Sequence, residues 1–269
     1  MKSLKIFVAA LILAATISPF SVANAQNLSY ALNVNVGMPL GNFANCSSID
    51  NMALLFSANR DGKQPSEAGM GVGLGLDFKV SYNLSNSLSL FGQLGVVVNN
   101  LGQSALDSID YYHTYTMLGD ANVITSPTMF SFPLLVGARY DWNLVNNFGL
   151  FAEVGLGLNF RTMTNMELKS QYPSTTPIEA ETGRAMFAIT DTYKAKLSTS
   201  FAFELGAGVN LTNHISLGLY YINLGSAEVK YDVERTIDYL SGDSRSLSGE
   251  LTAGKVSPQM LTLRASFKF

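Results

Sequence analysis

The chain has 269 residues, with 17 Lys and Arg against 20 Asp and Glu, and only 14% of its residues are charged. A net charge of −3 without a basic cluster argues against nucleic acid as a partner, and a single cysteine, Cys46, excludes an intramolecular disulfide. Because ordinary soluble domains are about 25% charged, the low fraction favours a protein with a large lipid-facing surface.

The first 25 residues have the pattern of a secretory signal peptide. Lys2 and Lys5 precede an apolar run at 6–17, and 22–25 ends in an A-x-A-like cleavage site. The run is shorter than the roughly 20 residues of a transmembrane helix, so we expect cleavage after Ala25, not a retained anchor. Residues 26–269 then form one domain, with a net charge of 15 − 20 = −5 once the two lysines are removed.

A short phrase occurs three times, as YNLSNSLSLF at 82–91, WNLVNNFGLF at 142–151 and VNLTNHISLG at 209–218. Each copy separates two stretches in which apolar residues alternate with small or polar ones, the period of a β-strand. Asparagine tolerates left-handed backbone and bonds its own turn, so each phrase predicts a tight turn. The predicted turn residues are Asn83, Asn86, Asn143, Asn146, Asn210 and Asn213.

The alternation predicts eight strands in chain order. The uncharged segment 81–106 is the best alternative candidate for a membrane helix, but its polar residues recur with period two, which suits a strand. The predicted strands are 30–38, 72–82, 88–98, 130–142, 148–160, 197–209, 215–221 and 261–269.

Short turns alternate with long segments at about 39–67, 99–129, 161–196 and 226–257, as in an up-and-down meander. The strands match the roughly 9–11 residues that a tilted strand needs to cross a bilayer, and inside lipid the sheet must close. A soluble barrel would expose the Leu and Phe face to water. The predicted fold is therefore all-β: an eight-stranded antiparallel up-and-down transmembrane β-barrel with short periplasmic turns and long extracellular loops.

The mature chain resembles the small bacterial outer-membrane β-barrel proteins, especially the outer-membrane β-barrel domain families common in Bacteroidetes. TLRASFKF at 262–269 resembles the C-terminal signal read by the barrel assembly machinery: Thr262, Phe267 and Phe269 match, and Arg264 replaces a usual glycine. FPLLVGARY at 132–140 resembles a proline-containing fourth-strand phrase. The resemblance implies a place in the bacterial cell outer membrane, contact with its lipid, and the assembly machinery as a partner.

The interior of an eight-stranded barrel is just wide enough to be filled by side chains. Strand phase places four acids and four bases inside, which we interpret as a self-neutralising polar network that plugs the barrel, with Arg139 and Glu153 facing each other. A gated conduit or proton path is the alternative. Inward glycines in GVGLGLDF and GLGLNF lie within strands, so they make room for neighbours and form no phosphate loop. The predicted network is Asp77, Lys79, Arg139, Asp141, Glu153, Glu204, Arg264 and Lys268.

No catalytic, cofactor-binding or metal-binding residues are predicted. His113 and His214 fall at opposite ends of the barrel, and neither lies beside a nucleophile with an orienting acid or in a ligand-spaced cluster. Aromatic residues near the turn ends of strands predict an interfacial girdle instead. These residues are Tyr82, Tyr140, Trp142, Phe148 and Phe269.

Two strands continue in phase into the long segments, which predicts a protruding β-rim. The outward face of strand 148–160 runs on through Met166 and Leu168, and that of strand 215–221 through Val229 and Tyr231. A sheet edge there offers strand addition to a partner; solvated loops without a ligand are the alternative. We expect a non-enzymatic structural or surface-interaction protein. A narrow porin, or an accessory barrel of protein secretion, is the second hypothesis, and an outer-membrane hydrolase the third.

Overall fold

The computed structural model describes residues 27–46, 67–103, 105–107, 120–145, 148–173, 185–239 and 242–269 of the chain. The predicted signal peptide at 1–25, His113 and Asn146 lie outside the described residues. Cleavage after Ala25 therefore stays a prediction.

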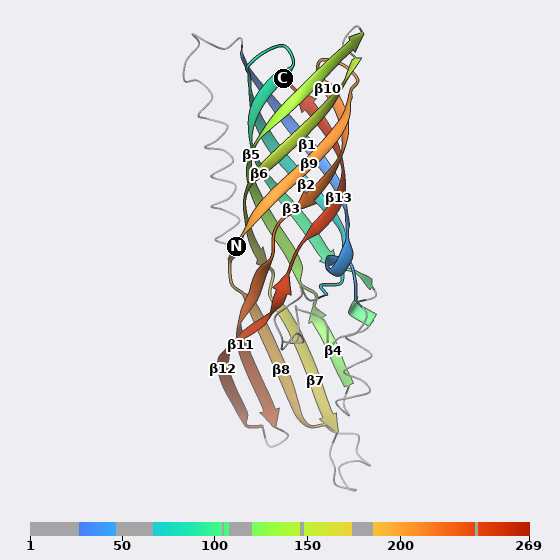
Figure 1. Ribbon diagram of the computed structural model, residues 1–269. Helices are drawn as coiled ribbons and strands as arrows, with labels where there is room; N and C mark the ends of the chain where they lie inside the picture. Colours follow the sequence, from blue (N-terminus) through green and yellow to red (C-terminus); the bar gives the residue numbers. More distant parts are fainter. Residues whose placement is uncertain are drawn as a thin grey trace.

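Eight strands of the described chain form a closed barrel, in the spatial order β1-β13-β10-β9-β6-β5-β3-β2 (Figure 1). Their pairings are all antiparallel, and chain neighbours pair directly or across a long excursion. The predicted fold class is confirmed. The bounds are β1 (Leu28–Pro39), β2 (Met70–Asn83), β3 (Leu88–Leu101), β5 (Thr128–Val145), β6 (Phe148–Met163), β9 (Ser198–Asn210), β10 (Ile215–Asn223) and β13 (Gln259–Lys268).

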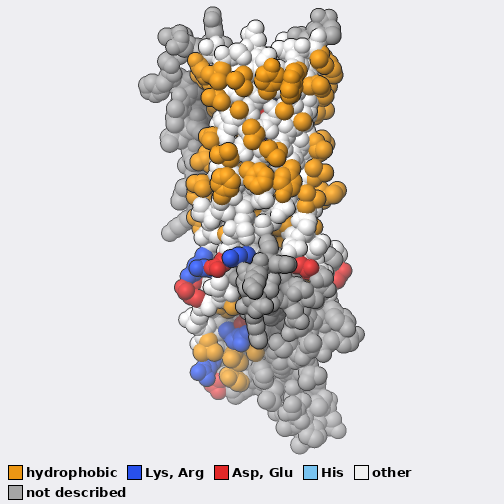
Figure 2. Space-filling model, viewed as in Figure 1, with side chains coloured by type: hydrophobic (Ala, Val, Ile, Leu, Met, Phe, Trp, Pro, Cys, Tyr) orange, Lys and Arg blue, Asp and Glu red, His pale blue; other side chains and the backbone are white. Residues whose placement is uncertain are grey.

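The outward face of the barrel is apolar (Figure 2). Val136 and Leu156 are each more than half exposed, which a strand in water would not tolerate over so large a surface. All nine charged residues within the eight barrel strands have the inward phase. Alternation with period two thus separates a lipid-facing surface from a polar lumen.

Two of the repeated phrases close their turns in the same way. The hydroxyl oxygen of Ser85 accepts hydrogen bonds from the backbone N–H groups of Ser87 and Leu88, at 3.3 and 3.1 Å. Thr212 does the same for His214 and Ile215, at 3.1 and 2.9 Å. The side-chain bonds in these turns therefore come from a hydroxyl, where the sequence analysis expected asparagine.

Five further strands form a second sheet beyond one end of the barrel, which we call the rim sheet (Figure 1). Each continues a barrel strand: β4 leads into β5, β6 into β7, β8 into β9, β10 into β11, and β12 into β13. The predicted rim is thus larger than expected, because strands occupy much of what the sequence analysis treated as loops. The order is β12-β11-β8-β7-β4, with bounds β4 (Asp120–Thr125), β7 (Met166–Pro173), β8 (Ala185–Ala195), β11 (Ala227–Tyr239) and β12 (Ser244–Val256).

Side-chain phase changes where the barrel meets the rim sheet. In β6 the inward residues are odd-numbered up to Met163, whereas in β7 the even-numbered Met166 is buried. In β10 the even-numbered Ile222 is buried, and in β11 the odd-numbered Val229. The prediction that outward phase persists from β6 into β7 and from β10 into β11 is therefore wrong. A shift of one residue at each break turns these side chains inward.

The break between β10 and β11 is fixed by hydrogen bonds from the lumen. The Leu224 carbonyl accepts from Asn159 Nδ2 at 3.3 Å and from the Ser200 hydroxyl at 2.6 Å. Gly225 has φ +75°, and a Cβ there would lie 1.9 Å from the Phe201 carbonyl oxygen. Only glycine suits this conformation and this close approach.

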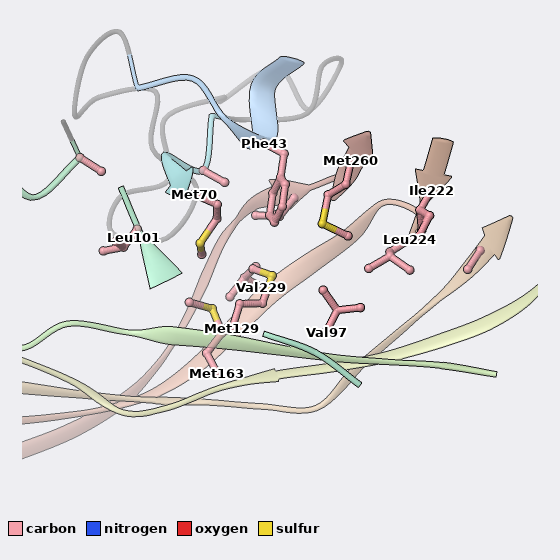
Figure 3. Close-up of a cluster of buried hydrophobic side chains, with 14 of the residues drawn as sticks. Phe43, Met70, Val97, Leu101, Met129, Met163, Ile222, Leu224, Val229 and Met260 are labelled. Carbon is pink, nitrogen blue, oxygen red and sulfur yellow. The ribbon is translucent and has the colours of Figure 1, made fainter. Parts of the chain in front are cut away.

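An apolar cluster, here called the apolar plug, fills the rim end of the barrel (Figure 3). Inward side chains of several barrel strands supply most of it, and η2 (Gly41–Phe43) adds Phe43. Four methionines contribute, and their flexible side chains suit an irregular space. The plug comprises Phe43, Met70, Val97, Leu101, Met129, Met163, Ile222, Leu224, Val229 and Met260.

Candidate functional site

The structure places all eight predicted interior charges inside the barrel, between the turn end and the apolar plug. Six of them are at most 6% exposed, while Asp141 and Lys268, nearest the turn end, are half-buried. Burying charges this deeply is costly unless they are paired and hydrogen-bonded. We call the set the interior network: Asp77, Lys79, Arg139, Asp141, Glu153, Glu204, Arg264 and Lys268.

Arg264 is the centre of the deeper half of the network. Its guanidinium donates two hydrogen bonds to Glu204, at 2.7 and 3.2 Å, and its Nε donates to Asn35 at 2.7 Å. Asp77 lies 3.9 Å from the same guanidinium and accepts hydrogen bonds from Asn33 and Asn35. The bidentate contact between Arg264 and Glu204 is the strong form of an arginine–carboxylate pair.

Glu153 is the centre of the half nearer the turn end. It forms an ion pair with Lys79, accepts from the Tyr220 hydroxyl at 2.9 Å, and lies 3.6 Å from Arg139. Arg139 and Glu153 are direct cross-strand partners, but each has a shorter contact elsewhere: Glu153 with Lys79, and Arg139 with Asp141 at 2.8 Å.

Asn210, predicted as a turn residue, is the last residue of β9 and is buried in the network. Its side-chain oxygen accepts from Arg139 at 2.6 Å and from Lys268 at 3.2 Å, and its nitrogen donates to Asp141 at 2.7 Å. It therefore links the charges at the mouth of the lumen.

Three inward aromatic rings that the sequence analysis did not single out as site residues carry the cations. Glycines make room for them: a Cβ on Gly137 would lie 2.5 Å from the Phe91 ring, and one on Gly206 2.1 Å from the Tyr220 ring. A cation over an aromatic face is attracted by the ring quadrupole. The pairs are Lys79 over Phe91 at 4.3 Å, Arg139 over Phe151 at 3.8 Å and Arg264 over Tyr220 at 3.9 Å.

The lumen has a polar half and an apolar half. A cavity of about 60 Å³, lined by residues that include Asn33, Lys79 and Lys268, lies near the turn end and has room for water. A smaller space of about 10 Å³ lies beside Glu204 and Arg264. The apolar plug follows on the rim side, a filling that the prediction of a polar interior missed. Its signal was the apolar character of inward residues near the rim ends of strands.

Arg161 is a ninth interior charge, which the sequence analysis also missed. It is 2% exposed, and its guanidinium donates to the backbone carbonyls of Val256 and Ala227, at 3.2 and 3.3 Å, and to the Ser198 hydroxyl at 3.4 Å. The arginine thus ties β6 to the start of β11 and the end of β12. Its inward phase, shared with Glu153, was the available signal.

The outer face of the rim sheet carries exposed ion pairs where the apolar band ends (Figure 2). Lys194 contacts Glu234 at 2.7 Å, and Lys196 contacts Asp232 at 2.9 Å and Glu250 at 2.5 Å. Such exposed pairs contribute little stability, usually under about 1 kcal/mol. Their significance is positional, since charges this dense exclude the sheet from hydrocarbon.

The inner face of the rim sheet is partly aromatic. Tyr193 packs edge-on against Tyr231 with ring centroids 5.8 Å apart, next to an ion pair in which Arg235 donates two hydrogen bonds to Asp191, each 2.7 Å. Burial raises the pKa of Tyr193 to about 12 and moves the pKa of Tyr231 well above its usual range. Both hydroxyls therefore stay protonated at physiological pH.

The other predicted turn residues within the described ranges lie at the turn end. Asn83 ends β2, Asn86 and Asn213 are exposed between strands, and Asn143 lies within β5, where it donates to the Asn86 carbonyl at 3.4 Å. His214, at the same end, has its Nδ1 3.2 Å from the Lys268 carbonyl oxygen.

The predicted girdle residues all lie exposed near the turn end, where Tyr140 and Trp142 form an edge-to-face pair with ring centroids 4.8 Å apart. Of the predicted assembly signal, Phe267 faces outward and Phe269 is 70% exposed. The backbone of Phe269 exchanges two hydrogen bonds with Tyr30, so pairing between β13 and β1 reaches the last residue.

Within the described ranges, no helix is long and apolar enough to cross a membrane. Nor does that part of the chain contain a group of three or more His, Cys, Asp or Glu side chains that could hold a metal ion.

The chain was compared with known proteins in sequence and in structure. No curated protein matches the chain in sequence. Among solved structures, a major outer membrane protein from Thermus thermophilus is 12% identical, over 90% of this chain and 99% of that one, with a TM-score of 0.42. OprG from Pseudomonas aeruginosa is 12% identical, over 90% of this chain and 96% of that one, with a TM-score of 0.38. Ail of Yersinia pestis is 11% identical, over 90% of this chain and 99% of that one, with a TM-score of 0.36.

The family model for the outer membrane protein beta-barrel domain matches residues 7–269, nearly the whole chain. The closed eight-stranded barrel and its uncharged outer band suit this assignment, which places the protein in the bacterial outer membrane. The chain belongs to the outer membrane protein beta-barrel domain family.

Proposed function

We propose that this protein is a non-enzymatic barrel with a closed lumen that uses its rim sheet to bind an extended polypeptide at the cell surface. The proposal rests on the position of β12 at the edge of the rim sheet. Within the described residues it pairs only with β11, and its side chains from Ser244 to Gly249 are all exposed. An unpaired strand edge is a template for a further strand.

The rim strands hold this edge away from lipid. The ion pairs of Lys194 and Lys196 lie between the apolar band and the rest of the sheet. The register from Tyr231↔Leu251 to Asp238↔Ser244 has no shift, so β12 stays paired with β11 over its exposed length. A partner segment that adds to β12 would extend a sheet anchored in the barrel wall.

The test shortens this hairpin without disturbing the register. Joining Arg235 to Leu247, which are cross-strand partners, through an Asn-Gly turn removes the distal part of the edge. We expect the purified wild-type protein to bind a subset of an array of extended peptides, and the shortened protein to lose that binding while its barrel stays folded. Equal binding by both proteins, or none by the wild type, would contradict the proposal.

A closed lumen opposes the alternative of a narrow porin. The polar cavity at the turn end favours a pore. However, the side chains of the interior network and of the apolar plug fill the lumen between this cavity and the rim end. We expect purified protein in planar lipid bilayers to give no steady conductance. Reproducible channels of uniform size would support the porin hypothesis and contradict the closed lumen.

Two processing steps complete the proposal: removal of residues 1–25 as a signal peptide, and recognition of β13 by the barrel assembly machinery. The mass of the protein isolated from outer membranes tests the first, with a chain beginning at Gln26 expected. Deletion of Phe269 tests the second, because an unchanged yield of folded barrel would argue against its role in assembly.

A further inference from the structure

A hollow crosses the lipid-facing surface of β1, β2, β3, β5 and β6. It is lined by outward apolar side chains, among them Leu90, Val136 and Leu156, and by the backbone at Gly92. The Tyr82 hydroxyl is its single side-chain polar group. The hollow is deepest at Gly92 and Ala138, two small residues on the adjacent strands β3 and β5 that have larger neighbours.

The hollow runs obliquely from the interface toward the middle of the barrel. Its two ends are set by the strand register: Leu28 pairs with Tyr82 at the turn end, and Val136 pairs with Leu156 partway along the barrel. Tyr82 belongs to the aromatic girdle that marks the membrane interface. A hydrocarbon chain whose head group lies at that interface follows the same course into the bilayer.

We propose that this hollow is a binding groove for one acyl chain of a phospholipid in the periplasmic leaflet. Its lining residues are uncharged, and all of them except Phe91 and Gly137 face outward in the apolar band, so the occupant lies in hydrocarbon. One end at the girdle and the other inside the bilayer match a chain attached to a head group. A second copy of the protein would instead need a broad complementary face of roughly 800 Å² per partner.

The groove can be filled without disturbing the barrel. A Cβ at Gly92 would have nothing within 4 Å, so a leucine there projects into the groove and displaces its occupant. Ala138→Leu fills the same floor from β5. The matched control is Ala265→Leu on β13, which also faces outward and lies opposite β5 in the barrel order.

The experiment measures phospholipid bound to the intact mature barrel by native mass spectrometry, with phosphatidylethanolamine added to the detergent solution. We expect the wild type and Ala265→Leu to keep one phospholipid at concentrations where Gly92→Leu and Ala138→Leu keep none. A heat-dependent shift in gel mobility shows that each variant is folded.

Equal retention by all four proteins would overturn the proposal, as would a wild type that keeps no phospholipid. Preferential retention of added lipid A, which belongs to the other leaflet, would also contradict it. A dimer that Ala138→Leu abolishes would assign the groove to a second copy instead. Strand addition at β12 is measured separately, so either proposal can fail alone.

Discussion

Replacing Arg264 with methionine should strongly destabilise the barrel. The substitution removes the bidentate bond to Glu204, the bond to Asn35 and the cation over the Tyr220 ring. Glu204 has 0% exposure and would lose its cation, while Asp77 would lose the guanidinium at 3.9 Å. Breaking one partner of a buried pair typically costs about 3–5 kcal/mol, which is the expected loss in unfolding free energy.

Removing the carboxylate as well should restore much of that loss. In the double variant Arg264→Met, Glu204→Met, neither charge is left uncompensated, and apolar replacement of a whole buried pair is often close to neutral. Asp77 keeps its bonds from Asn33 and Asn35. We therefore expect the double variant to be more stable than Arg264→Met by about 2 kcal/mol or more.

The assay is urea-dependent folding into phospholipid vesicles, followed by the fluorescence of the chain's single tryptophan, Trp142, on the lipid-facing surface. Gel mobility with and without heating provides an independent measure of the folded fraction. An Arg264→Met loss below about 1 kcal/mol, or a double variant no more stable than Arg264→Met, would refute the view that the two charges stabilise each other.

Three further predictions concern the wall and its breaks. Leu156→Arg places a charge on the lipid face and should cost about 2–4 kcal/mol in vesicle unfolding, and a loss near zero would contradict the phase assigned to β6. Gly225→Ala places a Cβ on a residue with positive φ and close to the Phe201 carbonyl, so we expect a loss of about 1–3 kcal/mol in unfolding free energy in the same assay. A neutral result would mean that the backbone between β10 and β11 relaxes easily. Thr212→Ala removes two turn hydrogen bonds and should cost roughly 1 kcal/mol. Thr212→Ser is its control, since it keeps the hydroxyl, and equal losses in both variants would contradict the hydroxyl's role.

The sequence allowed the barrel to be predicted because lipid imposes a strict rule on it. A strand that separates hydrocarbon from a polar lumen must alternate with period two, so the eight strands and the inward phase of Arg139 and Glu153 followed directly. Three similar turn phrases then fixed the strand count.

The contents of the site were harder to predict, because inward phase alone does not say which side chains meet. Lys79 reaches Glu153 from a strand 74 residues earlier in the chain, across the lumen. The role of Asn210 and the rings under the cations depend on this closure in the same way. The apolar plug was missed because most of its residues, such as Met260, lie just beyond the bounds predicted for the strands.

The rim sheet was underestimated for a different reason. Its strands are longer continuations of barrel strands, but the breaks between β6 and β7 and between β10 and β11 shift the phase by one residue. A pattern followed across these breaks therefore assigns Met166 and Val229 to the wrong side. No local propensity marks such a shift, apart from Gly225 with its positive φ.

The rim sheet also has a geometric consequence. In the described part of the chain it continues five adjacent barrel strands, β5, β6, β9, β10 and β13, and not β1, β2 or β3. A barrel alone is close to a cylinder and looks alike from every side in the membrane plane. The one-sided sheet gives this molecule a front and a back. A neighbour drifting in the same membrane can meet the charged outer face from one direction, whereas Tyr193 and Tyr231 on the inner face are buried, so rotation about the membrane normal becomes part of recognition.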